Sequence, residues 1–319
     1  MKKLLVLALA LCLVLTSVSA LADFPNGQPI YIYVCSGESG ATSLGINLLK
    51  PFLEKEFGTT IVVDYVKGNG GFKCWLTHQY DKPDGYSLIV VNDTMDYAGL
   101  NPQAPQTLNS RDFQLLGCQV VDISALACRV NETRWTDLAS MIEYAKENVV
   151  TVASSSATNE DAIPVYLMNK KFGTKFEIVV NSQSSDSAAT DVMGGHVDVY
   201  SNNVATAAKF AAQGNMKPLC VFNSERSQIW PDVPTFEEVT GVALSSHSAR
   251  GIMMPKGGDE ALVQRLVEGI AKCTQDPEYV KLMTEQYLEV VYLDPAQFQE
   301  LFDNGKADVM NILEDLGWK

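Results

Sequence analysis

The stretch Ile30–Ser43, read as IYIYVCSGESGATS, contains the pattern that decides the fold. Its first part, Ile30–Val34, is aromatic and β-branched, which is typical of a buried strand. The rest is a polar turn with two glycines, which allow positive φ or close approach to a ligand, and Thr42 or Ser43 is expected to cap the following helix. A strand, a small-residue turn and a helix N-terminus leave free N–H groups that suit a carboxylate or phosphate.

The same arrangement recurs twice in the second half of the chain. The predicted strand Val149–Ala153 runs into the polar turn Ser154–Asp161, and Phe176–Val180 runs into Asn181–Ser187 ahead of another helix. Isolated turns of this kind are common in parallel α/β proteins. Three of them from two halves of one chain predict a cleft that helix N-termini line.

Between the first turn and these two, strand and helix patterns alternate with short links. Thr60–Val66 and Tyr86–Asn92 read as strands, which predicts a parallel α/β layer. Pro51 is expected to kink or interrupt the first helix. Leu115–Val121 and Ser124–Val130 are predicted as two separate strands, with the second crossing into another domain.

The N-terminus has the composition of a secretory signal. Met1-Lys2-Lys3 precedes an apolar run, and small residues favour cleavage after Ala22, with cleavage after Ala20 as the alternative. No later segment approaches the roughly 20 apolar residues that span a bilayer. We therefore expect a signal peptide at 1–22 and an exported protein in the periplasmic or extracytoplasmic space.

The remaining chain is long enough for two domains. A return crossing near Gly251–Met254 predicts that the first α/β domain contains residues 23–124 and 247–319. The second α/β domain is then formed by residues 125–246.

Charge and cysteine content limit the partners and the chemistry. Removal of Lys2 and Lys3 changes the formal charge from 24 − 38 = −14 to 22 − 38 = −16, so nucleic acid is not expected as a partner. Six cysteines follow the signal, without metal-type spacing, and are expected to be buried thiols. An exported protein can also form one or two disulfides, for which Cys118 and Cys128 are the candidate pair.

Five motifs in order resemble one family of receptors. They are Ser39–Thr42 for a GGAT turn, Lys67–Gly71 for PGAGG, Lys82–Tyr86 for PADGY, Asp191–Asp198 for DLLGGQVD, and Pro231–Thr235 for PDVPT. The chain is similar in these motifs to the extracytoplasmic solute receptors of tripartite tricarboxylate transporters, also called Bug receptors.

The resemblance implies a two-domain, type II periplasmic-binding-protein fold that closes like a Venus flytrap on a small organic anion. It also implies a ligand site between the first βα turn and two turns of the second domain, which by position are Ser36–Ser43, Ser154–Asp161 and Asn181–Ser187. The candidate ligand-binding residues are Ser36, Gly37, Glu38, Ser39, Gly40, Ala41, Thr42, Ser43, Ser155, Ser156, Thr158, Asn159, Asp161, Ser182, Ser184, Ser185, Asn202 and His247. Ser43 replaces the aspartate of the family's GGATD, and Asn159–Asp161 replaces a glycine-serine stretch and a histidine. The ligand therefore stays open between a di- or tricarboxylate and an amino acid.

The charges of the three turns leave the mode of binding open. None of the turns contains lysine or arginine, so backbone N–H groups, hydroxyls, amides and bridging waters are expected to hold the carboxylate. They do contain Glu38, Glu160, Asp161 and Asp186. Either these acids face solvent or cap helices, or one of them meets a positive group on a zwitterionic ligand.

Catalysis is the rival class of function. Only three histidines are present, and the chain has no HExxH, GxSxG or Walker motif. We therefore expect a monomeric binding protein without metal or cofactor that works with integral-membrane transporter subunits. The alternatives are a solute-sensing partner of a two-component system and a secreted serine-dependent hydrolase.

Overall fold

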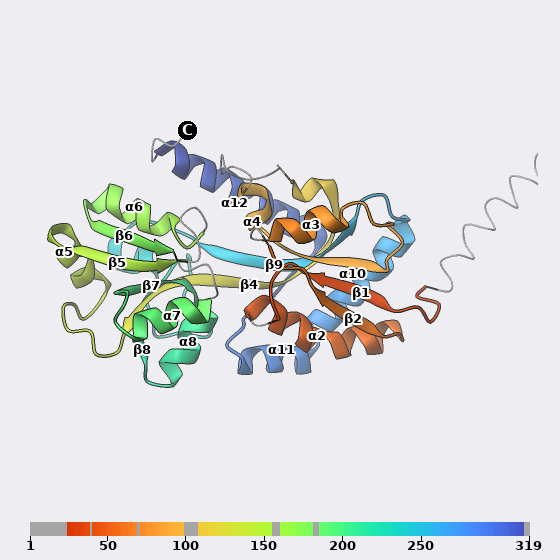
Figure 1. Ribbon diagram of the computed structural model, residues 1–319, viewed down its shortest axis with the longest axis horizontal. Coiled ribbons are helices and arrows are strands. Elements are labelled where there is room, and N and C mark those ends of the chain that lie inside the picture. The colour runs from red at the N-terminus through yellow and green to blue at the C-terminus, as the bar shows by residue number, and fades with distance from the viewer. Residues whose placement is uncertain are drawn as a thin grey trace, which may run out of the picture.

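The computed structural model describes residues 24–38, 40–68, 71–98, 108–154, 160–180 and 185–315 of the 319-residue chain. Figure 1 shows two lobes joined by long strands. We call the part with the first three strands the first lobe, and the part with strands β5 (Val149–Ser154) to β8 (Met216–Val221) the second lobe. Within the described ranges, no helix is long and apolar enough to cross a membrane.

The first lobe begins with the predicted parallel layer. Strand β1 pairs in parallel with β2 and with β3, as the alternating pattern indicated. In Figure 1, α2 and α11 lie on one face of this layer, and α3 and α12 lie on the other. The elements are β1 (Ile30–Val34), α2 (Ala41–Phe57), β2 (Ile61–Tyr65), α3 (Phe72–His78), β3 (Ser87–Asn92), α4 (Thr94–Ala98), α10 (Glu260–Thr274), α11 (Pro277–Glu285), β10 (Val290–Leu293) and α12 (Pro295–Asp315).

Two long antiparallel strands, β4 (Phe113–Arg129) and β9 (His247–Pro255), connect the lobes. The residues 113–123 of β4 pair with β9 in the first lobe, whereas 124–129 pair with β7 and β8 in the second. The prediction of two separate strands here was wrong. Register shifts at Leu115/Gly117 and Cys118/Val120 each insert an extra residue into β4, and such bulges bend one continuous strand in place of a turn.

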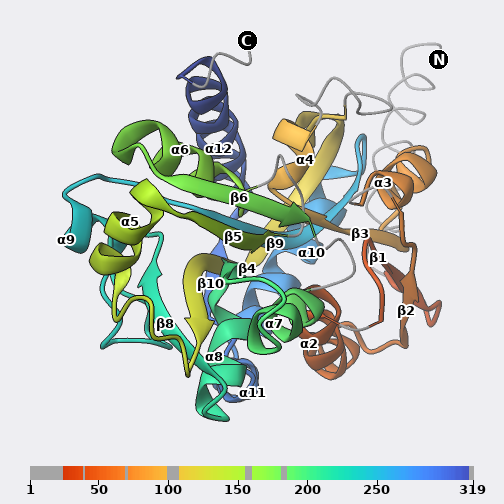
Figure 2. The same cartoon turned by 60° about the vertical axis from the view of Figure 1, so that its left-hand side comes forward.

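The second lobe has a sheet with helices on both faces. Strand β5 pairs in parallel with β6 and β7, and Figure 2 shows α6 on one side of this sheet and α7 and α8 on the other. The elements are α5 (Leu138–Glu147), β5 (Val149–Ser154), α6 (Ile163–Phe172), β6 (Lys175–Val180), α7 (Ser185–Met193), β7 (Val199–Asn203), α8 (Val204–Ala212), β8 (Met216–Val221) and α9 (Phe236–Thr240).

Each lobe has its own apolar core, but Ala205 of α8 belongs to the first-lobe cluster, and Tyr287 packs against clusters of both lobes. The first lobe has one large cluster that includes Ile32, Leu49, Trp75 and Ile252, and the second lobe has smaller clusters around its own sheet. Where β4 passes from one lobe to the other it carries two buried polar residues, Asp122 and Ser124.

Two local predictions about helices need correction. Helix α2 runs through Pro51 without the interruption that was one of the two expected effects, because this proline lies on the exposed side, where water can bind the helix carbonyl group that the missing N–H leaves without a partner. Its N-cap is Gly40 at φ 122°, with no side-chain cap, rather than Thr42 or Ser43.

The cysteines are all buried and free within the described part of the chain, as Cys35, Cys74, Cys118, Cys128, Cys220 and Cys273. The candidate pair Cys118–Cys128 was wrong because both residues belong to β4. Ten residues of extended strand separate them by roughly 33 Å, far beyond the reach of a disulfide.

Candidate functional site

A polar cavity of about 160 Å³ lies where β4 and β9 pass between the lobes. Strands of both lobes and the first residue of α7 contribute to it. The lining residues are Thr42, Asn92, Asp122, Ser124, Glu160, Asp161, Ser185, Asn202, Asn203, Ser248 and Arg250. At roughly 30 Å³ per water, this space holds about five waters, which is the scale of a small metabolite.

Strand alternation explains which side chains face the cavity. Asp122 pairs with Ser248 and Val120 pairs with Arg250 between β4 and β9. Successive side chains of a strand point to opposite faces, so alternate residues share one face. Asp122, Ser124, Ser248 and Arg250 therefore form one polar patch in strands that are otherwise apolar.

Arg250 provides the cavity with a buried positive charge. Its Nη2 donates a hydrogen bond of 2.8 Å to Asp122 Oδ2, and both residues are about 95% buried, at 6% and 4% exposure. Its Nη1 is buried and has no hydrogen-bond partner among the described residues. A buried guanidinium N–H without an acceptor is costly, so this atom offers a strong site for an anion.

A hydrogen-bond network fixes the opposite wall. Asn202 Nδ2 donates to Asp161 Oδ2 at 2.8 Å, while its Oδ1 accepts from Ser185 and from Asn203 Nδ2 at 2.9 and 2.8 Å. Asn203 Oδ1 accepts from the backbone N–H of Thr206 and caps α8. These contacts hold the second-lobe groups in fixed orientations, which lowers the cost of ordering them on binding.

Carboxyl groups dominate the electrostatics of this region. Burial raises the pKa of Asp122, although Arg250 opposes the shift. Burial, followed by the neighbouring carboxylates of Asp161 and Asp93, raises the pKa of Glu160 well above its usual range. Glu160 therefore holds a proton more readily than an exposed glutamate does.

A second acidic group lies on the other face of β9. Asp93 is 2% exposed, accepts the backbone N–H of Ala249 at 3.0 Å, and faces His247 Nε2 at 3.5 Å. Burial raises the pKa of Asp93 to about 6, against the lowering influence of His247. His247 pairs with Ile123, so its side chain points away from the face that Arg250 occupies.

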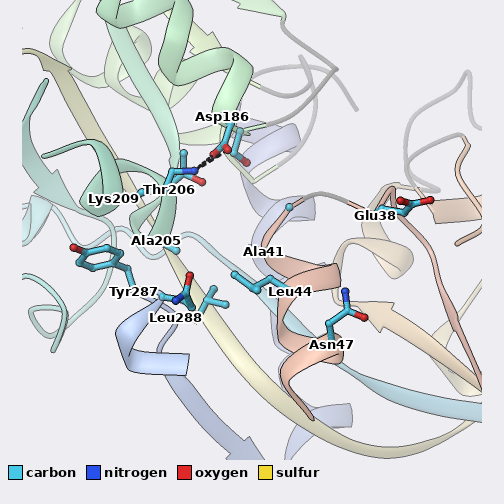
Figure 3. A pocket seen from close by; sticks show the side chains of 13 residues that line it. Glu38, Ala41, Leu44, Asn47, Asp186, Ala205, Thr206, Lys209, Tyr287 and Leu288 are labelled. Carbon is cyan, nitrogen blue, oxygen red and sulfur yellow. Dashed lines mark hydrogen bonds and ion pairs between the residues drawn. The ribbon is translucent and has the colours of Figure 1, made fainter. Parts of the chain in front are cut away.

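A larger cavity of about 350 Å³ adjoins the first, with Ser185 lining both. Figure 3 shows Ala41 and Leu44 of α2 facing Ala205 and Thr206 of α8 across it. Lys209 Nζ lies 2.7 Å from both carboxylate oxygens of Asp186 at its edge. Because side chains of both lobes line both cavities, together they form one cleft between the lobes.

The structure brings most of the described candidate residues to this cleft. Thr42, Asp161, Ser185 and Asn202 line the smaller cavity, and Glu38, Gly40, Ala41 and Ser185 line the larger one. His247 lines neither cavity. Ser39, Ser155, Ser156, Thr158, Asn159, Ser182 and Ser184 lie outside the described residues.

Three candidate residues of the first turn, Ser36, Gly37 and Ser43, line neither cavity and instead stabilise the conformation of the turn. The Ser43 hydroxyl donates to the carbonyl group of Gly37 and lies 3.2 Å from Ser36 Oγ. Ser43 is buried at the start of α2. These contacts fold the turn back on the helix, which brings Gly40 and Ala41 to the cleft.

The candidate residues from the sequence did not include Arg250, although Asn202 and His247 were chosen outside the three turns. The signal was present: polar residues alternate at Ser246, Ser248 and Arg250, and at Asp122 and Ser124, within apolar strands. Such a period of two predicts a polar face on a buried sheet.

No group of three or more His, Cys, Asp or Glu in the described ranges is arranged to hold a metal ion.

Two lobes that enclose a polar cleft define a solute-binding protein with the periplasmic-binding-protein fold, and the fold matches solved structures of that class. A family model described as tripartite tricarboxylate transporter family receptor matches residues 48–318. The chain belongs to this family, whose members are periplasmic solute receptors. The similarity to Bug receptors seen in the motifs is thereby confirmed.

Similar proteins include BugT of Bordetella pertussis, which is 24% identical over 283 residues that cover 86% of this chain and 85% of BugT. MatC from Rhodopseudomonas palustris, solved with bound malate, has a TM-score of 0.76 at 20% identity and covers 89% of this chain and 99% of its own. An R. palustris protein solved with adipate has a TM-score of 0.81 at 18% identity, covering 91% and 97%. At these identities the structures establish the fold.

Proposed function

We propose that this protein captures a small organic carboxylate in the cleft and delivers it to the membrane subunits of a tripartite tricarboxylate transporter. The observation that carries the proposal is the buried Arg250, whose Nη1 has no acceptor among the described residues and which lines a polar cavity between the lobes. A ligand carboxylate would accept from this N–H and relieve its desolvation.

The proposed site combines this anchor with groups of the second lobe. The Thr42 side chain and the first residues of α2 approach from the first lobe, and Ser185, Asn202 and Asn203 approach from the second. With the boundaries expected from the sequence, residues 23–124 and 247–319 form one domain and 125–246 the other. A ligand that contacts both would favour the closed arrangement of the lobes.

Binding without chemistry is the function we infer. None of the three histidines lines the cavity of 160 Å³: His78 pairs with Asp81, His196 is exposed, and His247 faces Asp93. A hydroxyl nucleophile in the cavity therefore lacks a histidine base. The carboxylates bound to MatC and to the R. palustris relative agree with a binding role for the family. Export by a cleaved signal peptide at 1–22 and action as a monomer are part of the same proposal.

A thermal-shift screen of the protein without residues 1–22 against mono-, di- and tricarboxylates and amino acids tests the binding step. A ligand at 100 times its dissociation constant should stabilise the protein by about 2.7 kcal/mol. Arg250→Gln should abolish the shift, whereas Arg265→Gln, a matched change on the far side of the first lobe, should preserve it. An unchanged shift in Arg250→Gln would contradict the proposed anchor.

The delivery step needs a test in cells. A strain that lacks this protein should lose uptake of the ligand found in the screen. Loss of transcriptional induction with normal uptake would favour the sensing role over transport.

A further inference from the structure

Tyr287 has a backbone conformation that normally belongs to glycine. It lies two residues after the end of α11 at φ 59°, in the left-handed region. Its N–H donates to the carbonyl group of Thr284, and the N–H of Leu288 donates to that of Met283, both at 2.9 Å, which is the Schellman arrangement of a helix C-terminus. The Cβ of an L-residue makes this conformation costly, and bulky side chains are rare there.

The same chain places glycine at other left-handed helix ends. Helices α2, α6 and α9 are followed by Gly58, Gly173 and Gly241, at φ 65°, 68° and 71°. A Cβ at any of these three glycines would meet nothing within 4 Å, so a side chain there would gain no contact. A strained residue persists only where its surroundings hold it, so the contacts of the Tyr287 side chain have to explain its presence.

The side chain of Tyr287 contacts both lobes. In Figure 3 its ring extends away from Ala41 and Leu44 of α2. It packs against the core of the first lobe and against an apolar cluster of the second lobe, which is formed by Ala125, Val204, Ala208, Val221 and Val233. A residue fixed to the end of α11 in the first lobe thereby forms an apolar contact with the second lobe.

A polar contact between the lobes lies two residues further along the chain. Ser227, between β8 and α9 of the second lobe, is 1% exposed, and its Oγ donates a hydrogen bond of 3.2 Å to Oε2 of Glu289. Glu289 directly precedes β10, whose Val290 pairs with Val120 of the crossing strand β4. The segment 287–289 therefore connects α11, the crossing strand and the second lobe.

We propose that Tyr287, with the Ser227–Glu289 hydrogen bond, holds the two lobes together in the ligand-free protein and so sets the fraction of molecules that are closed before ligand binds. Rotation of the lobes about β4 and β9 moves the tyrosine ring against one of its two apolar clusters, so the contact opposes opening. Glycine at this position would end α11 with less strain, but the lobes would lose the contact. This inference goes beyond the proposed function, because it concerns the lobes and not the ligand.

The contact also affects the affinity for ligand. A ligand that contacts both lobes binds the closed arrangement, and its apparent dissociation constant is the intrinsic constant divided by the closed fraction. Loss of the contact therefore weakens all ligands of the cleft by the same factor. A side chain that touches one group of a ligand would instead change the order of affinities among ligands.

The distance between the lobes in the ligand-free protein tests the proposal directly. Helices α2 and α8 line the larger cavity from opposite lobes, so spin labels at Lys55→Cys and Gln213→Cys report its opening by pulsed electron paramagnetic resonance. Both positions are exposed, and the six cysteines of the described residues are buried. Tyr287→Gly should shift the distances to larger values and raise the apparent dissociation constants about tenfold. Tyr287→Phe keeps the ring and should change neither.

Asn26→Gly is the matched control for the backbone. Asn26 is exposed, lies ahead of β1, and is the other non-glycine residue of positive φ in the described ranges, at 47°. Its exchange for glycine relieves the same kind of strain and should change neither the distances nor the affinity. Ser227→Ala removes only the polar contact, and it should lengthen the distances in the same direction by a smaller amount.

The ligand-free distances decide the outcome. If Tyr287→Gly and Ser227→Ala both give the wild-type distances, the proposal is overturned, and a loss of affinity in Tyr287→Gly would then mean that the ring touches the ligand. If the distances lengthen although no carboxylate binds to the wild type, the proposed function fails and the contact between the lobes stands.

Discussion

The guanidinium of Arg250 and the carboxylate of Asp122 form a buried ion pair, 2.8 Å from Nη2 to Oδ2, between the two strands that join the lobes. The residues are diagonal neighbours, because Asp122 lies opposite Ser248 and Arg250 lies opposite Val120. The pair therefore serves two purposes. It ties β4 to β9 at the crossing, and it orients the remaining N–H groups of Arg250 for a ligand.

Breaking this pair from one side should destabilise the protein. Asp122→Ala leaves the guanidinium buried without its carboxylate, so the free energy of unfolding should fall by about 3–5 kcal/mol in urea denaturation. The double variant Asp122→Ala, Arg250→Met should cost clearly less than the sum of the single variants. Strictly additive losses would show that the two side chains are not coupled.

Asp93 should make stability depend on pH. Its pKa is about 6 in the folded protein, above the value of 3.8 for an unperturbed Asp. The folded state therefore binds this proton more tightly than the unfolded state does. Protonation of Asp93 thus adds to the free energy of unfolding below pH 3.8, and this stabilisation is lost as the pH rises through about 6. The loss amounts to about 3 kcal/mol by pH 7.

The variant Asp93→Asn isolates this contribution, because it keeps an oxygen for the N–H of Ala249 and does not titrate. The unfolding free energy of the wild type minus that of Asp93→Asn should decrease between pH 4 and pH 7. In a His247→Gln background the decrease should be larger, because Asp93 loses its nearby positive partner. A difference that is constant with pH would contradict the assigned pKa.

Gly251 on β9 should tolerate no side chain. A Cβ there would collide with the backbone carbonyl oxygen of Gly117 and with the ring of Phe298. Gly251→Ala should lower the free energy of unfolding by about 1–3 kcal/mol or more, because neither backbone nor a buried ring can move easily.

Gly305 provides the matched control. It lies within α12, and a Cβ there meets nothing within 4 Å. Gly305→Ala should be neutral or stabilise by up to about 1 kcal/mol through helix propensity. Equal effects of the two substitutions in thermal unfolding would argue against close packing at the crossing.

Gly40 should matter for binding more than Lys67, a lysine beside the same turn. It caps α2 at φ 122° and lines the larger cavity, so a β-branched residue would distort the turn. Gly40→Val should weaken ligand binding in calorimetry by a larger factor than Lys67→Ala, whose side chain packs beside Gly37. Equal losses from both variants would indicate that the turn contributes charge rather than backbone shape.

Closure on ligand should involve a hinge at the two crossing strands. Each lobe has its own apolar core, and polar side chains of both lobes line the smaller cavity between them, so a rotation of the lobes leaves most of each core intact. The radius of gyration from solution scattering should fall when ligand is added to the wild type. It should not fall for Arg250→Gln at the same ligand concentration, and an unchanged wild-type radius at saturation would contradict closure.

The sequence by itself determined the class of fold and indicated which turns border the cleft. Ile30–Val34 and the turn after it predicted a strand followed by a helix, and β1 and α2 confirm this order. The polar turns predicted a cleft, and Thr42, Asp161 and Ser185 all line its smaller cavity. These predictions succeeded because hydrophobic period, glycine and turn polarity are local properties of the chain.

Only the tertiary structure decided which charged groups share that cleft. Asp122 and Arg250 are 128 residues apart in sequence, and their contact depends on the register between β4 and β9. A shift of one residue would turn Arg250 to the face that His247 occupies. The continuous β4 likewise follows from bulges and pairing partners on both lobes, which no local pattern specifies. Strand register is set by packing across the whole sheet, and that packing places a guanidinium in the cleft.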